Sequence, residues 1–311
     1  MPAKSEVQVA LYGMRLLADG QPWTSNDYIY NKVMMKNKLL AVMMLFVVST
    51  LFMLLRKGEE QVLGNDAPVV QTATPTQEAE PTAPLYDVGL PVFTMPRTSQ
   101  VIAHTGYTVS YNRDTRIPNW VAWTLTPQRY AEVVSRYDKF LPDPEVDDPV
   151  TTDDYKGAGI DRGHMCPAAD NKWSEQAMRE SFYMTNVCPQ HHNLNRGDWK
   201  ELEEACREWA MDSGELHIVC GPILYRGDHR RIGTHQVVVP EAFYKVVLCL
   251  NPPKAVGFIY KNTSGNHPLD AYVNTVDEVE RITGLDFFSG LPDSLEQVVE
   301  GRCDLDEWPR P

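Results

Sequence analysis

DDYKGAGIDRGHMCPAADN (residues 153–171) and SFYMTNVCPQHHNLNRGDWKELE (residues 181–203) are the two stretches from which this 311-residue chain is best interpreted. Together they hold imidazole, amide, guanidinium and carboxylate side chains. Gly and Pro residues surround these side chains, a composition typical of turns. The sequence therefore predicts polar turns that expose reactive side chains.

The residue types in these stretches match what hydrolysis of a phosphodiester requires. A neutral imidazole, such as that of His164, can take a proton from water near pH 7. A hard divalent cation such as Mg²⁺ prefers oxygen ligands, which the amides of Asn186 and Asn195 offer. A guanidinium can hold non-bridging phosphate oxygens, a role open to Arg162 or Arg136.

The spacing of Asn195 and Glu203 adds a carboxylate to this group. Eight positions are a little over two turns of one helix, so both side chains could face the same side, and Glu203 could hold a metal-bound water. Asn195 could instead cap the following helix, since Asn is a favoured N-cap. Asp198 lies closer to the helix start and fits the cap better, which leaves Asn195 free to bind metal.

Several of these side chains also have structural interpretations. Arg162 could orient its loop through ion pairs instead of touching substrate, and Glu203 could be an ordinary helix-surface carboxylate. Asp161 is expected to hold the loop or the histidine, and Gln190 to brace the loop. Trp199, on a predicted amphipathic helix, is expected in the core.

D-R-G-H followed by M-C-P-A, joined to T-N-V-C-P-Q and L-N-R-G-D-W-K-E-L-E, resembles the DNA/RNA non-specific endonuclease family. The similarity covers most of residues 85–300 and is densest over 153–209. It implies an α+β fold with a ββα-metal core in a mixed, mainly antiparallel sheet with flanking helices. It also implies a hydrolase that cuts DNA and RNA without sequence choice, uses one Mg²⁺ or Mn²⁺, and leaves 5′-phosphate ends.

The resemblance implies a role for each matching residue. His164 is the general base, and Asn195 is the only direct protein ligand of the metal. Glu203 holds a metal-bound water, and Asn186 supports the site. The family also places an Arg upstream of D-R-G-H against the phosphate, and the stretch SRYDKFLPDPEV makes Arg136 that residue.

Outside these motifs the pattern predicts strands with interspersed helices, as in α+β proteins. The predicted helices are Asp198–Asp212 and Thr275–Gly284. The predicted strands are Tyr107–Tyr111, Trp120–Leu125, His217–Cys220, Gln236–Val239, Tyr244–Leu250 and Ala255–Tyr260.

The first third of the chain has a different character. Residues 39–55 are uncharged and as a helix would rise about 26 Å, which predicts one N-terminal transmembrane helix. Residues 1–38 form a short tail, unless translation starts at Met34. Residues 56–84 are rich in Pro, Thr and Glu, which predicts a flexible tether. Residues 85–305 are predicted to form the nuclease domain.

Lysines ahead of residues 39–55 favour a cytoplasmic N-terminus and an exported domain. The length of the run and the lack of an A-x-A-like site favour an uncleaved anchor over a cleaved signal that would release a secreted protein, and the lack of an Arg-rich amphipathic transit peptide in residues 1–57 favours a bacterial cell membrane. The six cysteines could form disulfides after export, but the sequence names no pair. No C-x-x-C spacing indicates a structural zinc site.

The formal net charge of -13 argues against a passive nucleic-acid binder, so a polyanionic substrate needs a local basic groove, a metal ion or both. Two other functions stay open: a non-catalytic nucleic-acid-binding or scaffold protein of this fold, and an exported phosphodiesterase for a smaller substrate. Members of the family are often dimers, which raises a homodimer as a partner. The sequence identifies neither an interface nor an inhibitor protein.

Overall fold

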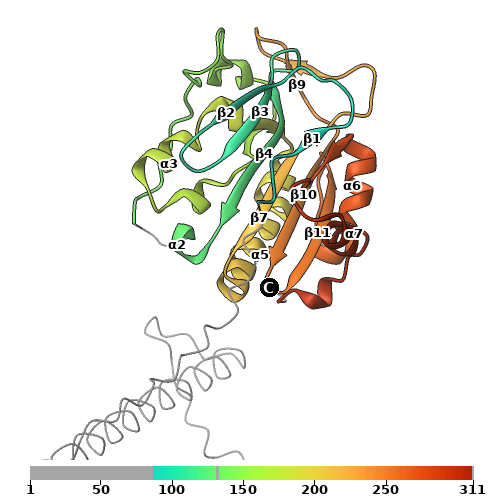
Figure 1. Ribbon diagram of the computed structural model, residues 1–311. Helices are drawn as coiled ribbons and strands as arrows, with labels where there is room; N and C mark the ends of the chain where they lie inside the picture. The colour runs from blue at the N-terminus through green and yellow to red at the C-terminus, as the bar shows by residue number, and fades with distance from the viewer. Residues whose placement is uncertain (1–86, 131–132, 310–311) are drawn as a thin grey trace, which may run out of the picture. The chain divides into compact units, whose positions relative to one another are not determined.

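A seven-stranded sheet forms the centre of the structure (Figure 1). The computed structural model describes residues 87–130 and 133–309. The strand order is β12-β11-β10-β7-β4-β3-β2, and all neighbouring strands are antiparallel. These strands are β2 (Gln100–Ala103), β3 (Thr108–Asn112), β4 (Ile117–Leu125), β7 (Leu216–Ile223), β10 (Ala242–Leu250), β11 (Pro253–Lys261) and β12 (Val273–Asn274).

The short connections between neighbouring strands explain why the strands are antiparallel. Short turns join β2 to β3, β3 to β4 and β10 to β11, and a short turn can join only antiparallel neighbours. The α+β class and the mainly antiparallel sheet are therefore confirmed. The prediction of a mixed sheet is wrong for the described strands, where the one parallel pairing is an isolated bridge between Leu141 and Tyr183.

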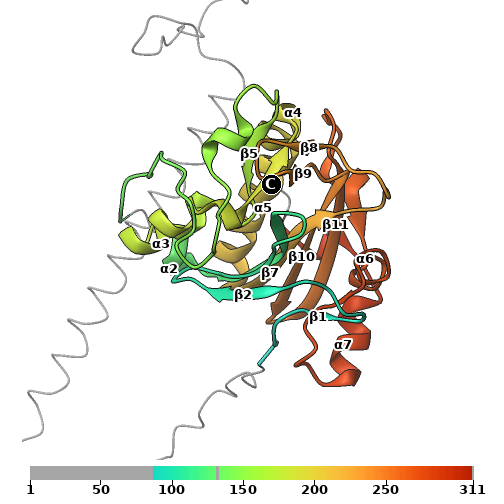
Figure 2. The same cartoon turned by 90° about the horizontal axis from the view of Figure 1, so that it is seen from above.

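Both faces of the sheet are covered, and so its central strands are apolar on both sides. All of β10 up to Cys249 is buried. On one face, α5 (Asp198–Ser213) buries Trp199 and Trp209 against the rings of Phe243 and Phe258. The second face is covered by α6 (Val276–Thr283) and α7 (Asp293–Glu300), as Figure 2 shows from above.

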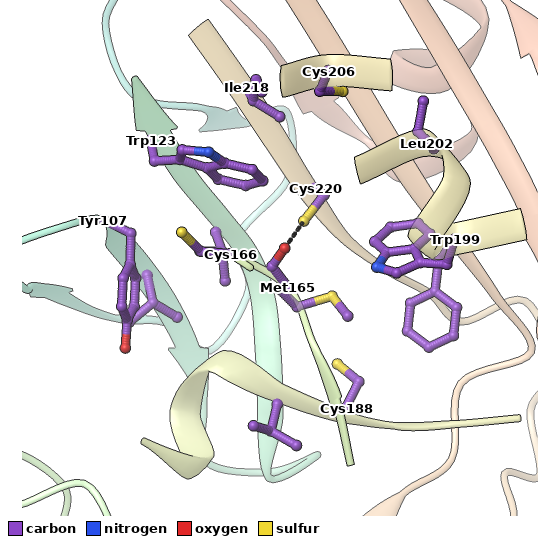
Figure 3. Close-up of a cluster of buried hydrophobic side chains, with 14 of the residues drawn as sticks. Tyr107, Trp123, Met165, Cys166, Cys188, Trp199, Leu202, Cys206, Ile218 and Cys220 are labelled. Atoms are coloured by element: carbon purple, nitrogen blue, oxygen red, sulfur yellow. Dashed lines mark hydrogen bonds between the residues drawn. The ribbon is translucent and has the colours of Figure 1, made fainter. Parts of the chain in front are cut away.

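The core under α5 also holds most of the thiols (Figure 3). Cys220 donates from Sγ to the backbone carbonyl of Met165 at 3.3 Å. All six cysteines are free: five are buried and Cys303 is exposed. None of the disulfides that the sequence left open is formed in this structure.

The long connection from β4 to β7, residues 126–215, contains both polar motif stretches and the two-stranded ribbon of β5 (Asp161–His164) and β6 (Val187–Gln190). The D-R-G-H stretch is therefore a strand, and its prediction as a turn is wrong. Ladder pairing with β6 holds it extended, which the local Gly and Pro content does not reveal.

The remaining elements are short. The six predicted strands and two predicted helices are confirmed, each with ends shifted by a few residues. The others are β1 (Val92–Phe93), β8 (Arg231–Ile232), β9 (Val237–Val238), β13 (Leu285–Asp286), α2 (Pro127–Tyr130), α3 (Glu175–Glu180), α4 (His192–Arg196) and the 3₁₀ helices Thr152–Tyr155, Ala168–Asn171, Met184–Asn186, Leu269–Tyr272 and Leu305–Glu307.

The predicted tail, transmembrane helix and tether (residues 1–38, 39–55 and 56–84) lie outside the described residues. Within 87–130 and 133–309, no helix has both the length and the apolar character needed to cross a membrane.

Candidate active site

A cavity of about 590 Å³ lies where the β5–β6 ribbon meets α4 and α5. His164, Asn195 and Glu203 all line it, together with Arg136 and Arg162. Five of the predicted site residues are thus brought together from four segments of the chain. The lining carries an excess of positive charge, because six of its side chains are basic and two, Asp161 and Glu203, are acidic; the basic ones are Arg136, Lys156, Arg162, Arg196, Lys200 and the buried Arg207.

The β5–β6 ribbon sets the direction of the His164 side chain. Gly163 pairs with Cys188 and His164 with Val187. A Cβ on Gly163 would lie 2.1 Å from Oε1 of Gln190, so only glycine allows the Gln190 side chain to cross the ribbon there. Gln190 therefore packs against Gly163, and both polar atoms of its side chain are buried without a hydrogen-bond partner among the described residues.

Aromatic rings fix the His164 imidazole. Its centroid lies 5.0 Å from that of Phe140 and 4.8 Å from that of Phe182, the latter edge-to-face. Nε2 is enclosed and has no hydrogen-bond partner among the described residues. Burial, and then the positive charges of Arg136 and Arg162, lower the His164 pKa to about 3. The imidazole is therefore neutral over the physiological pH range.

The carboxylate of Asp161 connects the ribbon to α4. It accepts from Nδ2 of Asn195 at 3.0 Å, lies 3.2 Å from Nδ1 of His192, and lies 3.5 Å from Nε of Arg196. Partial burial raises its pKa, but the hydrogen bonds from Asn195 and His192 outweigh that effect and hold it below the usual range. Because Asp161 occupies the amide nitrogen of Asn195, the amide oxygen stays available for a ligand.

Asn195 and Glu203 lie on two consecutive helices: the predicted helix begins at Asp198 as expected, and α4, which carries Asn195, was not predicted. The break falls at Gly197, which has φ -108° and ψ -115° and serves as the N-cap of α5. A Cβ there would lie 2.6 Å from the carbonyl oxygen of Asn193. The two side chains nevertheless line the same cavity.

Asp198 does not cap α5 as predicted. It is the first helical residue, and its carboxylate accepts from the backbone N–H of Asn266 at 2.8 Å and from the hydroxyl of Tyr272. Asp198 thus attaches α5 to the segment after β11. Asn195, inside α4, is not the cap either, which agrees with its availability as a ligand.

Glu203 lies above a buried group of charges. Burial raises its pKa to about 7, against the lowering effect of Lys245 and Arg207. Arg207 donates to Asp170 at 3.1 Å, and the carboxylate of Asp170 also accepts from Nε1 of Trp123. Arg207 is four residues after Glu203 on α5, a helical spacing from which the sequence could have identified it.

Arg136 and Arg162 keep their charges free. Each guanidinium lies over an aromatic ring, Arg136 at 5.1 Å from the centroid of Phe182 and Arg162 at 4.7 Å from that of Phe140. Neither forms an ion pair with any described residue, and both are exposed at the cavity. Arg162 therefore does not orient its loop through ion pairs with the described residues, and that alternative is wrong.

Asn186 is not brought into the cavity. It is fully buried, its Oδ1 accepts from the backbone N–H of Cys166 at 2.9 Å, and its Nδ2 donates to the carbonyls of Cys166 and Ser181. Every polar atom of this side chain is satisfied, which holds the chain directly after His164 in place. Asn186 therefore affects the site only by fixing the backbone of Cys166, two residues after His164.

The fold and this cavity agree with one family of proteins. The model of the DNA/RNA non-specific endonuclease family matches residues 86–294. The chain belongs to that family, and the resemblance seen in its motifs is confirmed.

Two relatives and one solved structure show the extent of the similarity. The mitochondrial nuclease EXOG of Danio rerio is 36% identical over 222 residues, which cover 65% of this chain and 64% of that protein. A nuclease of Nostoc sp. is 35% identical over 213 residues, covering 64% and 76%. A chain in the crystal structure of the EndoG/EndoGI complex is 27% identical with a TM-score of 0.60, covering 64% and 89%. This chain thus spans less than two thirds of the length of the EXOG relative.

Proposed function

We propose that this chain is a metal-dependent nuclease that hydrolyses phosphodiester bonds of DNA and RNA without sequence choice and leaves 5′-phosphate ends. The observation that carries the proposal is the convergence of His164, Asn195 and Glu203 on one cavity with a basic rim. Family membership supports the same reaction. The relatives named above are nucleases by name, which agrees with it.

In this proposal His164 is the general base. Because Nε2 is enclosed, Nδ1 is the nitrogen that can take a proton from water in the cavity. A pKa of about 3 makes the free enzyme's imidazole a weak base. A phosphate held between Arg136 and Arg162 would neutralise the two charges that lower that pKa, so substrate binding would make His164 more basic.

The donor set fits a hard divalent cation. Asn195 Oδ1 is oriented toward a ligand by the bond from Nδ2 to Asp161, and Glu203 supplies a carboxylate in the same cavity. No three His, Cys, Asp or Glu ligand atoms of the described residues cluster at this cavity, which argues against a softer metal with a complete protein cage. Asn195 would be the direct ligand and Glu203 an outer-sphere group.

When bound, Mg²⁺ or Mn²⁺ would stabilise negative charge on the phosphate and the leaving oxygen. The β5–β6 ribbon followed by α4 and α5 would then form the ββα-metal core that the family resemblance implies. Arg136 and Arg162 would hold the phosphate from the rim, in positions where their charges are unpaired.

The charge distribution supports a backbone-directed reaction. The chain as a whole is acidic, with a net charge of -13, yet six basic side chains gather at this one cavity. Contacts to phosphates position a nucleic acid without reading its bases, so a site of this kind would cut many sequences.

The decisive test is digestion of plasmid DNA and of a structured RNA by the full chain, with Mg²⁺ or with EDTA. The proposal expects metal-dependent cutting of both polymers and 5′-phosphate ends that a ligase accepts directly. Failure to cut either polymer would contradict it and favour a non-catalytic binder or a phosphodiesterase for small substrates, which a dinucleotide or p-nitrophenyl ester assay separates.

A further inference from the structure

Helices α6 and α7 lie side by side over the face of the sheet opposite α5 (Figures 1 and 2). Three carboxylates from these two helices meet there. Asp277 and Glu280 lie on α6, and Glu300 is the last residue of α7. One oxygen from each of the three lies within 4.8 Å of the other two. Asp277 is exposed, Glu280 half-buried and Glu300 buried.

Glu300 is the unusual member of this cluster. It is only 4% exposed, and its Oε1 is buried with no hydrogen-bond partner among the described residues. An unpartnered carboxyl oxygen at this depth is costly, because burial removes its water without replacing it. The charged groups that act most strongly on Glu300 are all acidic: Glu280, Glu296, Asp277 and Asp286.

No shared proton is recorded at this oxygen. Two carboxyl groups that share a proton approach to about 2.5–2.7 Å, the range of a charge-assisted O–H···O bond. Oε1 of Glu300 has no hydrogen-bond partner among the described residues, which include Asp277 and Glu280. Phe287 donates its backbone N–H to Oε1 of Glu280 at 2.7 Å, which orients that carboxylate but leaves Glu300 without a donor.

A cation does explain it. Ca²⁺ binds oxygen at 2.3–2.6 Å, so oxygens that share one ion can be up to about 5 Å apart. The spacing of at most 4.8 Å falls within that limit. A bound cation would also give the buried Oε1 of Glu300 the partner that it lacks among the described residues.

We propose that Asp277, Glu280 and Glu300 form a calcium site that fastens α7 to α6. Water would complete the coordination on the open side at Asp277. This site is separate from the proposed catalytic metal at Asn195, since the two lie on opposite faces of the sheet. Its effect is on the stability of the layer formed by α6 and α7.

Isothermal titration calorimetry with CaCl₂ tests the site on the full chain carrying Asn195→Ala, which removes the proposed catalytic ligand. One Ca²⁺ is expected to bind per chain. Adding Glu300→Gln or Asp277→Asn is expected to weaken binding at least tenfold, whereas Asp212→Asn, the same change at an exposed position of α5, leaves it unaltered. At a hundredfold excess over Kd, Ca²⁺ should raise Tm by about 5–10 °C.

Absence of Ca²⁺ binding by the Asn195→Ala chain would overturn the site. Equal affinity in the Asp277→Asn chain would also overturn it, and because Asp277 is exposed this variant does not depend on how the core tolerates Glu300→Gln. Nuclease activity is not measured in either arm. Failure of this proposal is therefore distinguishable from failure of the proposed function.

Discussion

His164 combines a fixed ring, an enclosed Nε2 and a neutral charge state, which are the properties expected of a general base. Replacing it by Asn keeps a polar side chain of similar size and removes the base. We expect kcat/KM on plasmid DNA to fall by about 10²–10⁴-fold. The matched change His267→Asn, outside the cavity lining, should leave it within twofold, and full activity in His164→Asn would contradict the assignment.

The same imidazole should make the fold acid-sensitive. Its pKa is about 3 in the folded chain against an ordinary 6.5. Between these values the unfolded chain binds more protons, so stability falls as pH drops from 6.5 toward 3 and is unaffected by this group above 6.5. From pH 7 to pH 4, His164→Asn should lose less stability than the parent by on the order of 2–3 kcal/mol. Urea unfolding at both pH values measures this, and parallel losses would argue against a buried neutral His164.

Individual residues differ in how far the sequence predicts them. The meeting of His164, Asn195 and Glu203 at one cavity could be predicted because their motifs have distinctive spacing, while their chemical roles stay predictions. The role of Asp161 in orienting Asn195 could not, since it depends on β5 lying next to α4. Asn186 shares a motif with the others yet is buried with all its polar atoms satisfied, and motif membership alone does not separate these two situations.

At the scale of elements, the close packing of the β5–β6 ribbon requires a glycine at position 163. In Gly163→Ala the new Cβ would meet Gln190 at 2.1 Å from Oε1 and 2.7 Å from Cβ, so the ribbon would have to open. We expect a loss of stability of about 1–3 kcal/mol and a parallel loss of activity. Gly227→Ala, whose Cβ would enter open space, is the control in thermal unfolding and cleavage assays. Equal Tm values for the two variants would contradict the packing argument.

Helices and strands with a regular hydrophobic pattern could be predicted from the sequence. Elements whose conformation depends on pairing with a distant segment could not. The helix Asp198–Ser213 and the strand Ala242–Leu250 follow directly from their apolar patterns. D-R-G-H was mistaken for a turn because only its pairing with Val187–Gln190 makes it a strand. The helix α4 was missed because five residues are too few to show a helical hydrophobic period.

At the scale of the whole molecule, an acidic protein with a basic cavity among its described residues should bind nucleic acid mainly through that cavity. We expect log(kcat/KM) on DNA to fall linearly with log[NaCl]. Lys156→Ala removes one rim charge and should reduce the magnitude of that slope by about one. Lys261→Ala, away from the cavity, should not change it, and identical slopes in all three proteins would contradict substrate binding at the rim.

Residues 39–55 give a second prediction at this scale, from sequence alone. In bacterial cells the chain should sediment with membranes and expose its nuclease domain on the exported side, and deleting 39–55 should leave it in the soluble cytosolic fraction. The mass of the exported protein discriminates between an uncleaved anchor and a cleaved signal. A full-length product that stays soluble would contradict the anchor.

The pairing of Leu125 with Leu216 closes residues 126–215 into a single excursion between two adjacent strands, β4 and β7. The cavity-lining residues all come from this excursion, while the sheet contributes none. The candidate active site is thus contained in one continuous segment whose two ends are fixed by β4 and β7. A variant that replaces residues 126–215 as a unit would therefore have to keep the contacts of Trp199 and Trp209 of α5 with the sheet.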